Sequence, residues 1–204
     1  MSYPLPLRRG RLVAATAVLA CALVLAGCAG SDPQPPSSAA QSDAAGDLLS
    51  THDLAGLDTA EVIERLDTLP LAERPTDLLA SVQPDAVVLT DDQDRETWLP
   101  MPTDEVYISV APYREQTHEC HFHSLTTCVG ELGNETVQVV LTDADGDVLI
   151  DETRETYDNG FVGLWVPRDL EGTLTIEHDG RTGTVPVATM DADDPTCLTG
   201  LRLT

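Results

Sequence analysis

Apolar residues change their spacing along the chain. From Ala86 onward they alternate with polar residues over short runs, the two-residue period of a β-strand with one buried face. Turn sequences such as Asp143-Ala144-Asp145-Gly146 and Asp179-Gly180 separate these runs at hairpin spacing. The expected strands span residues 87–90, 106–110, 137–141, 148–153, 161–166, 174–177 and 185–189. Many short strands with few helices predict an antiparallel β-sandwich or barrel-like domain over residues 85–204.

Residues 47–84 show a helical period instead. Asp58, followed three positions later by Glu61, fits a capping box at the start of a helix. The apolar residues that follow at helical spacing are Val62, Ile63, Leu66 and Leu69. Pro70 interrupts this pattern, and Pro75 suits the first turn of a second short helix. The apolar residues of that second helix would be Leu78, Leu79 and Val82. We therefore predict a short helical N-terminal region and an α+β fold.

The first 46 residues have the composition of a targeting segment and a linker. Three arginines precede an apolar run, Leu12–Gly27, that is too short and wrongly flanked for a stable membrane span. Its end, Leu25-Ala26-Gly27-Cys28, resembles a bacterial lipobox. We predict a lipoprotein signal peptide over residues 1–27 and lipidation of Cys28, which anchors the protein on the extracytoplasmic side of a membrane. An ordinary signal peptide with a chance cysteine is the alternative. Residues 28–46 carry little to bury and predict a disordered tether.

The charge of the chain limits its partners. It has 35 acidic against 11 basic residues, a net charge of −24, and no lysine. Such a surface repels nucleic acid and anionic lipid, so we exclude both as binding partners. It attracts cations and basic proteins, but weakly and mainly at low salt.

One stretch concentrates reactive side chains. It contains His118, Cys120, His121, His123 and Cys128 within eleven positions. Thiolate and imidazole are the ligands that soft and borderline transition metals prefer. In one regular strand these side chains would point to opposite faces, so a bend between positions 120 and 123 is needed to gather them on one ion.

The cysteine count also points to chemistry. If Cys21 leaves with the signal peptide and Cys28 is lipidated, Cys120, Cys128 and Cys197 remain, an odd number in an oxidising compartment. The outcomes are one disulfide with a leftover thiol, or a site in which Cys197 is the third thiolate. A purely structural framework would normally use an even number of cysteines.

The ligand types favour copper. Copper(I) accepts two or three soft ligands and copper(II) binds imidazole well, whereas the tight spacings of a structural zinc site are absent from the sequence. Two thiolates could close to a disulfide and reduce copper(II) to copper(I), so an enzymatic role as a cysteine-dependent copper(II) reductase stays open. The alternatives are a structural Cys120–Cys128 disulfide, a thiol–disulfide or interaction lipoprotein without metal, and a zinc-binding lipoprotein.

The segment from His118 to Glu131, together with Thr196-Cys197-Leu198-Thr199, resembles the CueP family of periplasmic copper-binding proteins. The resemblance implies copper binding and copper resistance through Cys120, Cys128 and Cys197, with His118, His121 and His123 as further candidate ligands. It also implies reduction of copper(II), delivery of copper to a client protein, and a homodimer formed through the helical N-terminal region. The reduction would need a thiol reductant as a further partner. The lipobox and tether depart from that pattern and suggest a membrane-anchored form.

Overall fold

The computed structural model describes residues 38–204, with side chains from residue 44 onward, and these residues belong to one compact unit. The predicted signal peptide, the lipobox and residues 28–37 of the tether lie outside the described residues. No helix within the described range is long and apolar enough to cross a membrane. Helix α1 (Ser38–Thr51) begins inside the segment predicted as a tether. That part of the segment is helical because it is rich in alanine, the best helix former.

Helix α2 (Thr59–Asp67) forms where the sequence predicts it, and its capping box is present. The Asp58 carboxylate accepts from the Glu61 backbone N–H at 2.9 Å, and the Glu61 carboxylate accepts from the Asp58 N–H at 2.8 Å. These bonds satisfy two of the backbone donors that every helix start leaves unpaired. The buried apolar face consists of Val62, Ile63 and Leu66. A short 3-10 helix, η1 (Leu71–Glu73), follows Pro70.

The predicted second helix is wrong, because Leu78–Val82 form strand β1. Leu79 points to solvent between buried neighbours, which is the alternation of a strand. β1 pairs antiparallel with β2 (Ala86–Asp91), whose valine-rich sequence favours a strand. The Gln83 backbone N–H donates to the Ala86 carbonyl at 2.8 Å and closes the turn between them. Cross-strand pairing therefore overrides the weak helical spacing of so short a segment.

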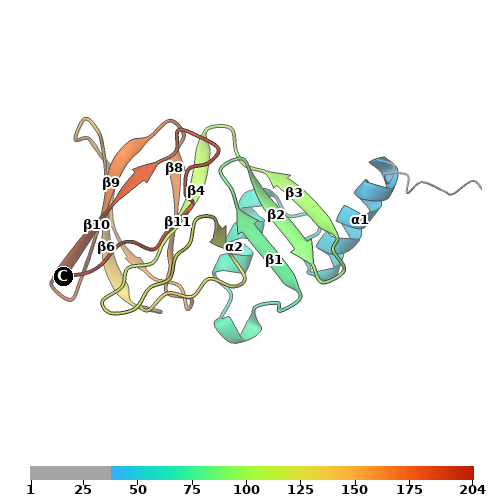
Figure 1. Ribbon diagram of the computed structural model, residues 1–204, viewed down its shortest axis with the longest axis horizontal. Coiled ribbons are helices and arrows are strands. Elements are labelled where there is room, and N and C mark those ends of the chain that lie inside the picture. Colours follow the sequence, from blue (N-terminus) through green and yellow to red (C-terminus); the bar gives the residue numbers. More distant parts are fainter. Residues whose placement is uncertain (1–37) are drawn as a thin grey trace, which may run out of the picture. The chain divides into compact units, whose positions relative to one another are not determined.

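The remaining strands complete three sheets, and the α+β prediction is confirmed (Figure 1). The first sheet has the order β3-β2-β1-β5, the second β10-β9-β6-β7 and the third β11-β4-β8. The bounds are β3 Glu96–Pro100, β4 Glu105–Val110, β5 His123–Ser124, β6 Thr136–Asp143, β7 Val148–Glu155, β8 Val162–Pro167, β9 Glu171–His178, β10 Arg181–Ala188 and β11 Cys197–Leu198. β11 pairs parallel with β4, and all other strand pairs are antiparallel.

Two apolar cores hold these layers together. The larger core fills the space between the second and third sheets and makes them a sandwich. The other lies between α2 and the first sheet, with Tyr107 of β4 among its members. Each fully buried Leu or Ile contributes on the order of 1.5–3 kcal/mol to folding. A third, smaller cluster consists of Ala111, Cys128, Phe161 and Cys197, with Cys120 packed against it. This cluster contains the sulfur atoms of the reactive stretch.

Candidate metal site

The chain that carries the site is fixed between two sheets. β5 adds the His123 segment to β1 of the first sheet, and β11 adds Cys197 to β4 of the third sheet. Thr196 links them, since its hydroxyl donates to the Val82 carbonyl at 2.6 Å and accepts from the His123 N–H at 3.0 Å. The backbone N–H groups of Thr196 and Cys197 both donate to the His121 carbonyl at 3.0 Å. Residues more than seventy positions apart are therefore held side by side.

A tight turn after β5 brings Cys128 back to the site. The Cys128 N–H donates to the Ser124 carbonyl at 3.1 Å, and the Ser124 N–H donates to the Cys128 sulfur at 3.4 Å. The Thr127 hydroxyl donates to the Ser124 hydroxyl at 2.6 Å and closes the turn further. This turn is distinct from the bend that the sequence required between positions 120 and 123, which lies at His121 and Phe122.

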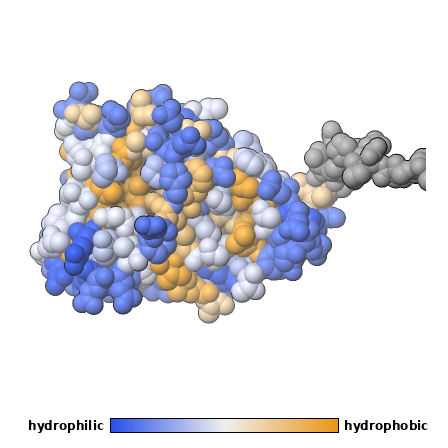
Figure 2. Space-filling model, viewed as in Figure 1, coloured by the Kyte–Doolittle hydropathy of each residue, from blue (hydrophilic) through white to orange (hydrophobic). Residues whose placement is uncertain are grey.

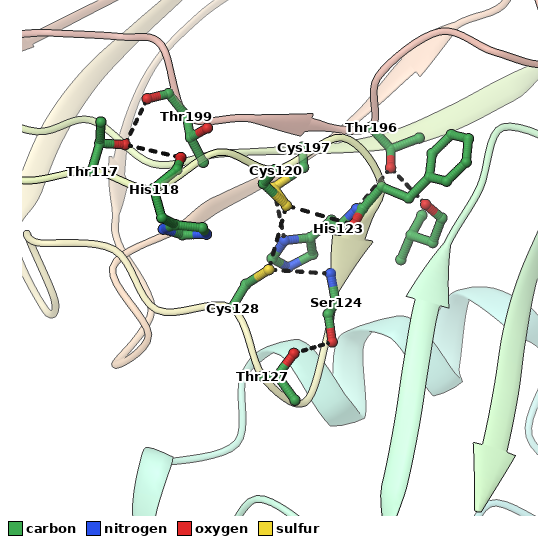
Figure 3. Close-up of a disulfide and its surroundings, with 12 residues drawn as sticks. Thr117, His118, Cys120, His123, Ser124, Thr127, Cys128, Thr196, Cys197 and Thr199 are labelled. Carbon is green, nitrogen blue, oxygen red and sulfur yellow. Dashed lines mark hydrogen bonds between the residues drawn. A yellow bond between two sulfur atoms is a disulfide. The ribbon is translucent and has the colours of Figure 1, made fainter.

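The three sulfur atoms meet, as Figure 3 shows. Cys120 and Cys197 form a disulfide, so the alternative Cys120–Cys128 pairing is wrong for this structure. The Cys128 sulfur, which is a free thiol, lies 3.5 Å from the Cys120 sulfur. The Cys197 sulfur lies 3.8 Å from Nδ1 of His123. Sequence proximity alone would favour joining residues 120 and 128, but the fold brings Cys197 to the same place.

The ligand atoms fall into two overlapping groups that share Cys128. One group is His118, Cys120 and Cys128, and the other is His123, Cys128 and Cys197. Within each group all ligand atoms lie within 4.8 Å of one another. His123 has no exposed surface and Cys197 is only 2% exposed, whereas Cys120 and His118 reach solvent. The first group is thus the outer one and the second is buried beneath it.

His121 lies outside both groups. Its side chain is exposed, its Nε2 lies 2.9 Å from the Asp193 carbonyl, and its ring packs on Phe122 at 4.6 Å between centroids. In a regular strand His121 and His123 would lie on the same face, so the bend at His121 and Phe122 is what leaves His121 exposed while His123 is buried.

The outer group lies beside an open depression of about 300 Å³, lined by Gln116, Thr117, His118, Val129, Gly130 and Glu131. The Glu131 carboxylate fixes one wall because it accepts hydrogen bonds from the backbone N–H groups of Arg114, Glu115 and Gln116, at 2.9–3.0 Å. The Thr117 hydroxyl donates to the Thr199 carbonyl at 2.7 Å. The loop that carries His118 is therefore held in place on both sides.

A close approach of two glycines forms the floor of the site. The Gly130 N–H donates to the Asn159 carbonyl at 2.6 Å, and a Cβ on Gly130 would meet the Gly160 carbonyl oxygen at 2.8 Å. Gly160 has a φ of +79°, which other residues rarely adopt. This contact places Phe161, which has no exposed surface, under the His123 ring at 4.6 Å between centroids.

Sequence reasoning missed a buried polar network behind His123. Asp67, the last residue of α2, accepts a hydrogen bond from His123 Nε2 at 3.0 Å, from the Tyr107 hydroxyl at 2.7 Å and from the Asn159 amide at 2.8 Å. Arg74 lies 3.8 Å from the same carboxylate and donates to the Cys128 carbonyl at 2.7 Å. The only signal in the sequence was an acid at the end of a capped helix, which is common on solvated helices. Only the packing of α2 against β4 and β5 shows that this acid faces inward.

This network changes the protonation of the site. Burial alone would raise the pKa of the Asp67 carboxyl, but the charge of His123 and the three hydrogen bonds hold it below its ordinary value. Burial lowers the pKa of His123, yet the charge and hydrogen bond of Asp67, followed by those of Cys128, raise it to about 9. Burial raises the pKa of the Cys128 thiol, whereas its hydrogen bond with His123 and the imidazolium charge lower it below the ordinary value. The network therefore shifts the pair of Cys128 and His123 toward a thiolate beside an imidazolium.

Thiolate and imidazole groups that converge beside a β-sandwich are typical of a protein that binds a soft metal ion, and this is the class that the fold and the site indicate. The family model described as periplasmic copper-binding protein CueP matches residues 61–202, and the chain belongs to this family. A solved crystal structure described as that of S.CueP is 36% identical, covers 78% of this chain and 97% of its own, and superposes with a TM-score of 0.73. No curated protein matches.

Membership in the CueP family confirms the resemblance that the cysteine motif suggested. It makes this chain a member of a copper-binding family that is periplasmic, and therefore extracytoplasmic. Copper is accordingly the ion to consider at the thiolate and imidazole groups described above.

Proposed function

We propose that this protein holds copper at Cys120, Cys128 and Cys197, with His123 in the buried group and His118 in the outer group. The observation that carries the proposal is the meeting of three sulfur atoms with two imidazole rings, from segments 77 residues apart. His121 is omitted from the ligand set because its ring faces the Asp193 carbonyl.

The distances suit one ion in each group. A borderline metal binds sulfur at about 2.3 Å and imidazole nitrogen at about 2.0–2.1 Å, so two ligands of one ion lie at most about 4.6 Å apart. The ligand atoms of each group lie within 4.8 Å of one another while Cys120 and Cys197 are joined, so once the disulfide is reduced to two thiolates only small adjustments are needed. Two or three soft ligands satisfy copper(I). Because both groups include Cys128, an ion that enters beside His118 could pass to the buried group by exchanging one ligand at a time.

The disulfide supports a reducing role. When Cys120 and Cys197 are thiolates, each gives up one electron as the S–S bond forms, and two copper(II) ions become two copper(I) ions. Cys128 takes no part in the disulfide, so its thiolate remains available to hold a copper(I) product beside His123. A thiol reductant must then supply two electrons to reopen the disulfide, and it would reach Cys120, the more exposed of the two bonded cysteines. The proposed reaction is thus a cysteine-dependent reduction of copper(II).

We also propose that the protein is a lipoprotein, anchored through Cys28 on the extracytoplasmic side, that contributes to copper resistance or passes copper to a client protein. The lipobox and the polar segment behind it support this proposal. The net charge of −24 favours the approach of copper cations. Metabolic labelling with a radioactive fatty acid should label the parent and not Cys28→Ser. Equal labelling would contradict the anchor.

A homodimer through the N-terminal half belongs to the same proposal. The outer face of the first sheet carries Leu79 at 58% exposure and Trp98 at 57%, and the strand register places both on one face with Val88. Figure 2 shows apolar patches among hydrophilic residues on the viewed face of the unit. Sedimentation of Leu79→Asp should give a monomer where the parent gives a dimer. A parent that sediments as a monomer would refute this part.

Copper(I) titration tests the central proposal. In competition with a chromophoric copper(I) chelator, Cys128→Ser should bind copper(I) far more weakly than the parent because both ligand groups lose their shared thiolate. His121→Ala is the matched control, since it removes an imidazole of the same stretch that lies outside both groups, and its affinity should equal that of the parent. Equal affinity and stoichiometry for Cys128→Ser and the parent would refute copper binding at this site.

A further inference from the structure

Asp67 is unusual among the acids of this chain. Among the residues that the structure describes, only Asp67 and Asp91 are buried acids, and Asp67 has no exposed surface at all. Removing a carboxylate from water costs several kcal/mol unless partners compensate it. Asp91 is paired locally with Arg95 at 2.6 Å, four residues away. The hydrogen-bond partners of the Asp67 carboxylate lie 40, 56 and 92 residues away, at Tyr107, His123 and Asn159, while Arg74 lies 3.8 Å from its Oδ1.

The geometry of these bonds fixes which nitrogen of His123 faces the sulfur atoms. Oδ1 of Asp67 lies 3.0 Å from Nε2 of His123, and a carboxylate can only accept, so Nε2 carries its hydrogen toward Asp67. Nδ1 therefore lies on the other side of the ring, 3.8 Å from the Cys197 sulfur. In a neutral imidazole with Nε2–H, Nδ1 has the free lone pair that a metal ion needs.

The carboxylate is itself held from several directions. The Tyr107 hydroxyl from β4 donates to Oδ2, while the Asn159 amide donates to Oδ1 beside His123. Asn159 also accepts from the Phe161 N–H at 2.9 Å, and Phe161 packs against the His123 ring. A ring flip of His123 would place a carbon against a buried carboxylate and leave the Asp67 oxygen without this partner. The ring is therefore restricted to one orientation.

We propose that Asp67 is a positioning residue of the copper site: it holds His123 so that Nδ1 points at Cys128 and Cys197. This inference rests on the proposed copper-binding function. It assigns to the end of α2, more than fifty residues before the cysteine motif, a role in the buried ligand group. Removing a residue that hydrogen-bonds to a metal ligand typically changes metal affinity 10–100-fold.

A double-mutant cycle separates positioning from structural support. Asp67→Asn in the parent should weaken copper(I) binding about 10–100-fold. In a His123→Ala background the same substitution should leave copper(I) affinity unchanged, because Asp67 then has no imidazole to orient. Equal weakening in both backgrounds, or no weakening in the parent, would overturn the proposal. Asp91→Asn is the matched control, since it neutralises the other buried acid of the described residues, which pairs with Arg95 and belongs to neither ligand group, and copper(I) affinity should be unchanged.

A measurement without copper keeps the positioning claim independent of copper binding and of how well the variants fold. In the nitrogen-15 histidine spectrum of the metal-free parent, the Nε2–H proton of His123 should resonate downfield and exchange slowly, as expected for a buried bond to a carboxylate. Asp67→Asn should remove this signature and Asp91→Asn should retain it. If the Nε2–H of the parent lacks the signature, whatever the proton on Nδ1 shows, the positioning claim fails even if copper binds. If the signature is present and copper(I) does not bind, the copper-binding proposal fails instead.

Discussion

Reduction of the Cys120–Cys197 disulfide should lower the stability of the metal-free protein by a calculable amount. The bond closes a loop of 77 residues, and the chain-entropy relation gives about 4.5 kcal/mol for a loop of that length. A bond between Cys120 and Cys128 would close only eight residues and contribute about 2.5 kcal/mol by the same relation. The loss on reduction therefore reports which cysteines are bonded.

Urea unfolding with and without a reductant measures this loss. With a denaturant dependence of about 2 kcal/mol per molar urea, a loss of about 4.5 kcal/mol lowers the unfolding midpoint by about 2 M. Cys128→Ser provides the decisive comparison, because it keeps the long-range disulfide and should show the full effect of reduction. If Cys120 were bonded to Cys128 instead, this variant would be insensitive to reductant, and the pairing described above would be refuted. If reductant does not change the urea unfolding midpoint of the parent protein, no disulfide stabilises it.

Three further predictions follow from the same geometry. Alkylation of Cys128 by iodoacetamide at pH 7 should be slower in His123→Asn than in the parent, because the variant loses the hydrogen bond and the imidazolium charge that lower the pKa of the Cys128 thiol, and the thiolate is the reactive form. An unchanged rate would contradict the proposed ion pair. Gly130→Ala should lower stability by about 1–3 kcal/mol in thermal unfolding, since its Cβ meets the Gly160 carbonyl at 2.8 Å. Gly200→Ala, with nothing nearer than 4.0 Å, is the control and should be nearly neutral. Zinc should displace copper(I) only in large excess, because each ligand group offers three side chains rather than the four of a closed zinc site, and displacement by equimolar zinc would favour the zinc alternative.

The secondary structure was predictable where one local signal acted alone. The capping box at Asp58 fixed the start of α2, and the two-residue period gave most strands of the sandwich. The prediction failed at Leu78–Val82, where the helical spacing of three apolar residues was too short to outweigh pairing with β2. A strand of five residues obtains its stability from pairing with its neighbour, and the spacing of its own apolar residues does not reveal that pairing.

The site was only partly predictable for a similar reason. His118, Cys120, His123 and Cys128 are close in sequence, so their types and spacing were enough to predict a metal site. The exclusion of His121 depended on which side chains the bend between positions 120 and 123 turns toward the sulfur atoms, and the sequence did not decide that. Asp67 gave no signal, because an acid at the end of a helix is ordinary unless the packing places it in the interior.

The sequence by itself determined the chemistry of this protein: an odd number of cysteines beside histidines, a predicted targeting segment, and a motif specific enough to indicate the copper-binding family. The tertiary structure decided which sulfur bonds to which, which histidine faces them, and which carboxylate lies behind that histidine. The physical reason is that side-chain type is a local property, which each residue carries into the fold. Burial and distance arise only when α2, β5 and β11 pack together, and they decide protonation, disulfide pairing and ligand geometry.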